Sequence, residues 1–467
     1  MNYREQVEQL LSNPDNLLKK KPFTRGSDMR LLSESCRSAA VGDMITPSLP
    51  SSKQIVIPQG QYLFELDPNC HKVLFDDNVP SITMKTKDGG YVTIEYKKMA
   101  VPFQEMIKNK HVLHLCGNKM QFTQLDTNPT EQQKKDFTVF KQYWEMRNQD
   151  GMRTKMVNAQ KSVGDAGLLY YFDYKGQIKS RLISYTDGYV LCPHNDENGD
   201  RILECVYYSS NGITYLDCYD DKYMTRFTQG GLDSSDNISG WVRNPAIEHG
   251  FSEIPLVTKR GKVAWDNVQN IIEVYEVIYN IFLVIQKRHG WGILYIKGKF
   301  NENGQKIAGA IILNDTSIEG NGSAEFKTPP SPDGMLDTLE LMEQTIQKGS
   351  GTTFLLPKDV KMSGDISGIA IQLTQSLDNE KALEGVIEWQ NVADKMCRLF
   401  KEGLSKELVS KGIQDTAVTD FNNLHISAAF KEWRPRNDYE YNQMLMTLKG
   451  AGLISAQTGI QKNTEST

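Results

Sequence analysis

Two histidines and a cysteine lie close together in one short segment, at His111, His114 and Cys116. On a helix, residues three apart share a face and could approach one metal ion, whereas on a strand they would not. Structural zinc sites use about four such ligands at defined spacing. The pair Cys192-Pro193-His194 has no matching second pair. Because the residues between the histidines are apolar, a buried segment is favoured, and the sequence predicts no metal site.

A second set of residues is spaced as in metal-dependent nucleases. Asp315 followed by Glu325-Phe326-Lys327 fits an Asp…Glu-x-Lys order, in which two carboxylates hold Mg²⁺ and the lysine steadies the nucleophile. The pattern is short, and both acids stand in a segment rich in turn-forming glycine and proline. Solvated charges on a hairpin are the favoured interpretation, and a nuclease stays an alternative.

Several catalytic motifs are absent from the chain. No Gly-x4-Gly-Lys-Ser/Thr loop occurs, since Gly261-Lys262 is followed by a valine, and no dinucleotide-binding glycine pattern follows a strand. No Gly-x-Ser-x-Gly pattern marks a nucleophilic serine. These observations argue against a nucleotide-driven motor and against a serine hydrolase, and no cofactor is expected.

An irregular stretch, Gly349 to Gly368, combines Thr352 and Thr353 with Lys358 and Lys361. Two aspartates in the same stretch offset the lysines, so one copy would bind DNA poorly. Affinity for DNA follows the number of phosphates neutralised, so many copies in a ring could touch the backbone without gripping it. An ordinary surface loop is an equally good interpretation of the residues alone.

The whole chain has 467 residues and a formal net charge of -5, from 53 basic and 58 acidic residues. This balance provides no general basic field, so any contact with DNA must be local or weak. The most apolar stretch, 277–285, is far shorter than the roughly 20 residues that span a bilayer. The seven scattered cysteines favour folding in a reducing cytoplasm. We expect two to three domains, no secretory signal and no membrane segment.

Strand signals dominate before residue 265, in β-branched and aromatic runs separated by turn residues. A polar helix is expected over 1–18, and one helical segment over about 131–163. The last four strand runs are expected to form one meander of antiparallel hairpins, which makes this half α+β. The runs are 91–96, 167–172, 178–185, 202–208 and 213–219.

After residue 265 long helices are expected. The first, 264–289, has apolar residues almost all the way round, so it must be covered on several sides, either in a core or by neighbouring copies. Short strands at 292–297 and 310–313 and turn-rich segments separate it from a second helix, 335–348. A third, 369–408, contains Gly385 and Gly403 as candidate kink points. A strand at 425–430 and a helix at 439–449 complete the pattern.

Four places carry a resemblance to a known family. Residues 159–170 place a small-residue turn before an aromatic strand, and 249–257 lead from the strand-rich half to the long helices. Residues 361–370 run into a long helix through Ser-Gly-Ile-Ala. The last place has 436–438, a helix, and then 452–458. In their order and spacing these segments resemble the portal proteins of tailed bacteriophages, the head-to-tail connectors, of the siphophage type, from about residue 130 to the end.

The resemblance implies a portal-like α+β fold with an antiparallel-sheet wing, long stem helices, a small α/β clip and a long kinked helix. Its parts would be a wing at 1–263, a first stem helix at 264–290, a clip at 291–333, a second stem helix at 334–348, a tunnel loop at 349–368, a long kinked wing helix at 369–412, and a C-terminal strand with a crown-like helical part at 413–467.

The resemblance also implies a function, which is not enzymatic. A homo-oligomeric ring, usually of twelve subunits, would form a channel at one capsid vertex of the virion, having assembled in the host cytoplasm. Double-stranded DNA would be packaged and ejected through it. The partners would be the terminase large subunit, the major capsid and scaffold proteins and the head-tail adaptor. The acidic face of the second stem helix (Asp337, Glu340, Glu343) would line the channel, and Thr352, Thr353, Lys358 and Lys361 would face DNA.

Two alternatives from other classes stay open. A metal-dependent DNA-processing nuclease would use Asp315, Glu325 and Lys327. A capsid or tail-assembly protein without a channel would also be large and enzyme-free, but it would not need a loop between two long helices.

Overall fold

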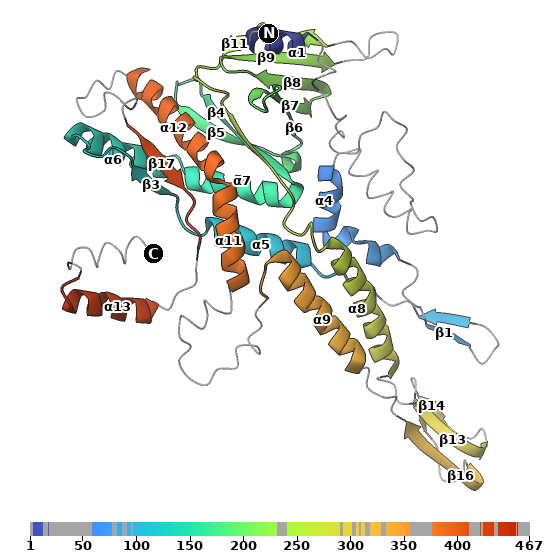
Figure 1. Ribbon diagram of the computed structural model, residues 1–467. Helices are drawn as coiled ribbons and strands as arrows, with labels where there is room; N and C mark the ends of the chain where they lie inside the picture. Colours follow the sequence, from blue (N-terminus) through green and yellow to red (C-terminus); the bar gives the residue numbers. More distant parts are fainter. Residues whose placement is uncertain are drawn as a thin grey trace, which may run out of the picture.

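A computed structural model describes most of the chain, and its described residues are 3–12, 17, 58–76, 82–85, 91–94, 97–230, 241–289, 293–300, 305–307, 310–312, 318–327, 333–354, 376–410, 421, 424–433, 438–453 and 455. The molecule is elongated (Figure 1). A sheet with the N-terminus lies at one end, two helices leave the helical centre side by side, and short strands lie at their tip.

The end that holds the N-terminus is a six-stranded antiparallel sheet with a helix on it. The order is β10-β9-β8-β7-β6, and β11 also pairs with β9. Val7 and Leu11 of the helix belong to the same buried cluster as Leu203, Leu216 and Phe227 of the sheet. The elements are α1 (Tyr3–Leu11), β6 (Val190–Asn195), β7 (Arg201–Ser210), β8 (Ile213–Tyr219), β9 (Tyr223–Gly230), β10 (Val242–Arg243) and β11 (Ile247–Glu248).

The hairpin between β7 and β8 confirms a turn that the sequence indicates. Ser210 pairs with Ile213, which leaves Asn211 and Gly212 as a two-residue loop. Both have positive φ, 53° and 78°. Asn-Gly suits such a loop because both residues adopt the left-handed conformation at little cost.

The single meander expected from the sequence is wrong, because its first two runs belong to a different sheet. That sheet has the order β12-β4-β5. Its central strand, β4, is buried along its first six residues. Apolar and polar residues therefore do not alternate along it as they do in a strand with one solvent-exposed face. A short 3-10 turn, η3 (Tyr185–Asp187), separates the two sheets along the chain. The strands are β4 (Asp165–Phe172), β5 (Ile178–Ile183) and β12 (Leu256–Arg260).

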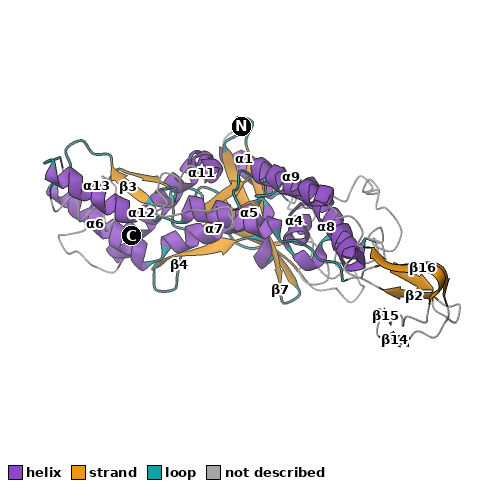
Figure 2. Ribbon diagram, turned by 90° about the horizontal axis from the view of Figure 1, so that it is seen from below, coloured by secondary structure: helices purple, strands orange, loops and turns teal. Residues whose placement is uncertain are grey.

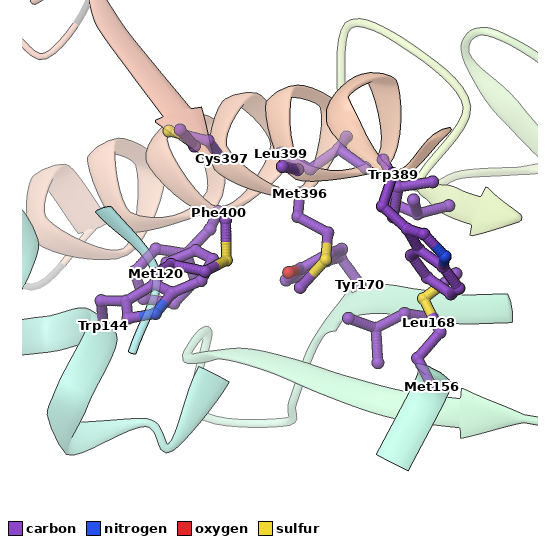
Figure 3. Close-up of a cluster of buried hydrophobic side chains, with 14 of the residues drawn as sticks. Met120, Trp144, Met156, Leu168, Tyr170, Trp389, Met396, Cys397, Leu399 and Phe400 are labelled. Atoms are coloured by element: carbon purple, nitrogen blue, oxygen red, sulfur yellow. The ribbon is translucent and has the colours of Figure 1, made fainter. Parts of the chain in front are cut away.

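The main core lies between the three-stranded sheet and the central helices (Figure 3). Trp144 packs edge-to-face on Phe400 at 5.2 Å between ring centroids, and Met396 points towards Tyr170. All four side chains are buried. The helices are α5 (Phe103–Cys116), α6 (Glu131–Met146), α7 (Gln149–Val163), α11 (Ser376–Glu388) and α12 (Gln390–Ser410).

The one helix expected over 131–163 is instead two, α6 and α7. The chain turns at Asn148, which has a φ of 48°. Asp150 fixes this break, since its carboxylate accepts from Trp144 Nε1 at 3.0 Å and from the Met120 backbone at 2.9 Å. The apolar pattern continues across the break, which is why the sequence does not show it.

The long helix expected from residue 369 is divided at Trp389, between α11 and α12, and residues 369–375 lie outside the described part. Neither glycine marks the division. A Cβ on Gly403 would lie 2.0 Å from Ile178 Cδ1 of β5, and one on Gly385 would lie 3.3 Å from Leu115 Cδ1 of α5. These glycines allow close packing, so the expectation of kink points is wrong.

The two helices that leave the centre are α8 (Gln269–His289) and α9 (Asp333–Ser350). Residues 264–268, expected as helix, form turns in which Val268 N donates to Trp265 O at 3.0 Å. The buried Trp265 indole, bonded to Glu65, anchors this turn.

The strands at the tip are β13 (Ile293–Phe300), β14 (Gln305–Ile307), β15 (Ala310–Ile312) and β16 (Ile318–Lys327). β13 pairs with β16, and β14 with β15, both antiparallel. The sequence predicts turns around Gly320-Asn321-Gly322, but β16 runs through them. Lys297 pairs with Ser323 and Lys299 with Glu319, so three residues of β16 stand opposite one of β13. Such an irregularity suits glycine, which lets a strand bend.

The remaining elements flank the centre, and Figure 2 shows α13 and β3 at the opposite end from the tip strands. Two further antiparallel pairs are β1–β2 and β3–β17. No helix among the described residues is long and apolar enough to cross a bilayer. These elements are α4 (Pro58–Leu66), η1 (Pro68–Cys70), η2 (Lys72–Phe75), β1 (Ile82–Lys85), β2 (Tyr91–Ile94), β3 (Gln121–Gln124), β17 (Ile426–Ala429) and α13 (Asp438–Gly450).

Candidate functional site

The pair of helices α8 and α9 packs through one apolar cluster that also includes α5. Ile272 and Tyr275 of α8 are buried with Leu339 and Ile346 of α9. Phe103 of α5 meets the Tyr275 ring edge-to-face at 5.0 Å. Burial, helped by the charge of a nearby glutamate, raises the pKa of Tyr275 to about 12. The cluster fixes how the helix pair leaves the body of the molecule.

Two polar side chains of α8 are buried and fully engaged. Glu276 Oε1 accepts from Val101 N at 2.8 Å and lies 2.6 Å from His71 Nδ1. Asn280 accepts from Met99 N at 2.8 Å and donates to Met99 O at 2.7 Å. Buried polar groups are tolerated when they are hydrogen-bonded in this way. They lock α8 to the segment that precedes α5.

The contact with Glu276 sets the charge state of His71. Burial by itself lowers the pKa of His71, but the hydrogen bond to Glu276 and its charge outweigh burial, so the net pKa is raised. The other ring nitrogen lies 2.9 Å from the carbonyl oxygen of Glu65, which can only accept. The imidazole therefore bridges two acceptors, an arrangement that favours the protonated ring.

These contacts show how much of α8 its own chain covers. Val277 and Val284 pack with Val73 of η2, on another side from the α9 contact. Among the described side chains of α8, Val274 is the large apolar residue that stays mostly exposed, at 51%. Other parts of the same chain therefore bury most of the apolar residues of α8, and neighbouring copies are not needed for this.

The acidic residues of α9 do not all lie in the same environment. Asp337 and Glu340 are exposed, whereas Glu343 is half-buried. Leu336 is 47% exposed, and Leu341 is 64% exposed. The solvent face of α9 thus combines acidic and apolar side chains.

The segment that follows α9 is held by His111 of α5. The Nε2–H of His111 donates to the Ser350 carbonyl at 2.9 Å, and Thr352 Oγ1 lies 3.1 Å from the same nitrogen. Thr352 has no exposed surface, and Gly351 before it has a φ of 65°. The Thr352 hydroxyl therefore faces α5, and the sequence expectation that it faces DNA does not describe this conformation.

Thr353 is bonded to α11, which begins after the expected loop. Its backbone N–H donates to Asp378 Oδ2 in the first turn of α11 at 3.1 Å. Asp378 is itself buried. Thr353, near the start of the expected loop, therefore meets Asp378, which lies beyond its end. Lys358 and Lys361 lie outside the described residues.

The residues of the nuclease alternative lie at the tip. Glu325 and Lys327 are on β16, opposite Tyr295 and Ile293 of β13. Asp315 lies outside the described residues. Within the described part of the chain, no group of three or more His, Cys, Asp and Glu residues is placed to hold a metal ion.

The comparison with known families identifies the family of the chain. The family model for the phage portal protein of the SPP1 Gp6-like type matches residues 92–465. The chain belongs to this family. Portal proteins are in general structural rather than enzymatic, and membership implies assembly into a capsid-associated ring at a vertex of the virion. No curated protein matches the chain.

In this portal protein, His111 is hydrogen-bonded within the fold and His114 packs against an aromatic ring. His111 and His114 are on α5, and burial lowers the pKa of His111 to about 3. His114 lies edge-on to Trp433 at 5.3 Å, and neither of its ring nitrogens has a hydrogen-bond partner among the described residues. Burial raises the pKa of the Cys116 thiol to about 11.

Sequence reasoning missed the residues that hold the helix pair in place. Asn280 gave a signal, because it interrupts the most apolar stretch of the chain. His71 gave none, because its partner Glu276 is 205 residues away. Asp378 likewise carries no motif.

Proposed function

We propose that this portal protein forms a ring of twelve subunits with a central channel, through which double-stranded DNA is packaged and later ejected. The observation that supports it most is a pair of long helices that carries a separate strand domain at its tip, in a chain of the portal family. In this proposal α8 and α9 are the stem, residues 291–333 the clip, and 1–263 with 369–412 the wing. Residues 413–467 contribute to the crown.

The solvent face of α9 is proposed to line the channel. Asp337 and Glu340 would present negative charge to the DNA backbone, with Glu343 beside them. Because affinity follows the number of phosphates neutralised, an acidic lining lets DNA slide without strong contacts.

The tunnel loop is proposed to follow Thr353, with its root anchored by His111 and Asp378. Thr352 and Thr353 would then hold the loop, and Lys358 and Lys361 would be its DNA-facing residues. These two contacts would hold the start of the loop against α5 and α11. The residues that follow Thr353 could then reach into the channel without moving the stem helices.

We assign the proposed partners of the ring to its clip and its wing. The clip would dock the terminase large subunit during packaging and the head-tail adaptor afterwards, and the wing would contact the major capsid and scaffold proteins. The ring would assemble in the host cytoplasm.

Reversing the charge of α9 tests this proposal. Heads assembled with a variant carrying Asp337→Lys and Glu340→Lys should package DNA more slowly than wild type, because lysines in every subunit would grip the phosphates. The control exchanges the two charges of an exposed ion pair on α6, by Lys134→Glu together with Glu131→Lys, which leaves the net charge unchanged. Equal packaging rates with rings intact would contradict the channel-lining role.

The nuclease alternative makes a separate prediction. Purified protein with Mg²⁺ should then cleave DNA, and Glu325→Ala should abolish the cleavage. We expect no cleavage by either protein.

A further inference from the structure

A basic cleft lies where the end of α7, the turn after β12, the end of α9 and α11 meet. Its volume is about 530 Å³, within the range of about 300–1,000 Å³ typical of ligand sites. Three acids and six cations line it, which leaves an excess of positive charge. The acids are Asp266, Glu384 and Glu388, and the cations are Lys161, Lys259, Arg260, Lys262, Lys348 and Lys381.

Four of the six cations are engaged by the protein itself. Two form close ion pairs with acids of the cleft, and the other two donate to backbone carbonyls. The contacts are Lys262–Asp266 at 2.9 Å, Lys381–Glu384 at 2.6 Å, Lys259 Nζ to Glu388 O at 2.8 Å, and Arg260 Nη2 to Leu191 O at 2.5 Å.

Lys161 and Lys348 are the cations without such a contact. Among the described residues, neither ammonium has a hydrogen bond or an ion pair within 4 Å. Lys161 stands in the last turn of α7, where burial lowers its pKa. The charges of Glu388 and Glu384 partly offset this lowering, and those of Lys381 and Lys259 add to it. A desolvated ammonium is costly to fold unless something pairs with it.

We infer that this cleft binds a phosphate-type oxyanion between Lys161 and Lys348. A phosphate group offers several acceptor oxygens and compact negative charge, and lysine is a common point-charge partner for it. Two of the three acids are already neutralised by ion pairs, so they do not cancel the attraction. The phosphate can come from a DNA backbone or from a free phosphate compound. The inference does not depend on the proposed channel.

Thermal unfolding of the purified full-length protein tests the site. Inorganic phosphate should raise the Tm of wild type by at least about 2 °C over chloride of the same ionic strength, since a ligand of the folded state stabilises it. Lys161→Met should remove this rise. The matched control is Lys155→Met, an exposed lysine on the same helix, which should keep it.

The same experiment separates a ligand site from a structural lysine. In chloride, Lys161→Met should be at least as stable as wild type, because it removes a desolvated charge that has no close partner. A lower Tm in chloride together with an unchanged response to phosphate would show that Lys161 is structural. No rise for wild type in phosphate would also overturn the inference, unless DNA binds through Lys161.

Binding of a short double-stranded oligonucleotide identifies the source. If DNA is the ligand, Lys161→Met should weaken binding about tenfold and lower the salt slope by about one, with Lys155→Met unchanged. A phosphate response without DNA binding would support a free phosphate compound. If neither probe binds and Lys161→Met stops ring closure, the cleft takes a carboxylate of a second copy, and the inference is wrong.

Discussion

At the scale of single residues, His111 connects three parts of the molecule. It stands on α5, holds the last carbonyl of α9 and contacts the Thr352 hydroxyl. Because a carbonyl oxygen can only accept, the Nε2 of His111 must carry the proton. The pKa of about 3 keeps the ring neutral near pH 7.

We predict that His111→Ala lowers the free energy of unfolding by about 1–3 kcal/mol, the cost of leaving buried polar groups unpaired. Denaturant unfolding measures this change. The control is His425→Ala, because the His425 side chain is 67% exposed and its contact is with Asp126 at the surface. Equal effects of the two substitutions would contradict the anchoring role of His111.

The buried contact between His71 and Glu276 predicts a pH dependence of the opposite sign from ordinary acid unfolding. The pKa of His71 is raised in the folded state. Its stabilisation is therefore complete below the unfolded-state pKa of about 6.5 and is lost as the pH rises through the folded-state value. Between pH 6.5 and 9 the Tm of wild type should fall more than that of His71→Gln. Parallel curves would show that the pair carries no charge.

At the scale of elements, α12 packs on β5 through a glycine. We predict that Gly403→Ala destabilises the protein by about 1–3 kcal/mol, because the new methyl group would overpack the contact with Ile178. Gly334→Ala on α9 is the control, since nothing lies within 4 Å of its Cβ position. It should be neutral or slightly stabilising, as alanine favours helix by up to about 1 kcal/mol over glycine. A stabilising effect of Gly403→Ala in denaturant unfolding would contradict the close packing.

Local pattern predicted most elements, and long-range pairing explains the errors. The expected helix at 439–449 and the strand at 425–430 are present as α13 and β17, within a residue or two. β4 was assigned to the wrong sheet because one of its two neighbours, β12, follows more than 80 residues later. The break at Asn148 depends on Asp150 meeting Met120, which no window around residue 148 contains.

The candidate site could be predicted only in outline. The acidic pattern of α9 was visible in the sequence, and Asp337 and Glu340 are exposed. The burial of Thr352 could not be foreseen, because it depends on a histidine 241 residues away. Buried contacts of this kind leave no local trace in one sequence.

At the scale of the whole molecule, the chain is a portal protein whose paired helices hold a strand domain away from the body. Most of α8 is covered by its own chain, so the helix pair does not need a neighbouring copy to bury its apolar residues. The exposed Val274 and Leu341 on this pair are then available for contacts between copies. We therefore predict that the single subunit folds by itself and that the subunits assemble into a ring in a second step.

Negative-stain electron microscopy of the purified full-length protein tests the central claim most directly. We predict closed rings with a central hole of about 20 Å or more, wide enough for a DNA duplex. Leu341→Asp should leave the subunit folded, by its unfolding curve, and reduce the fraction of rings. Closed particles without a central hole would contradict the channel and favour an assembly protein without one.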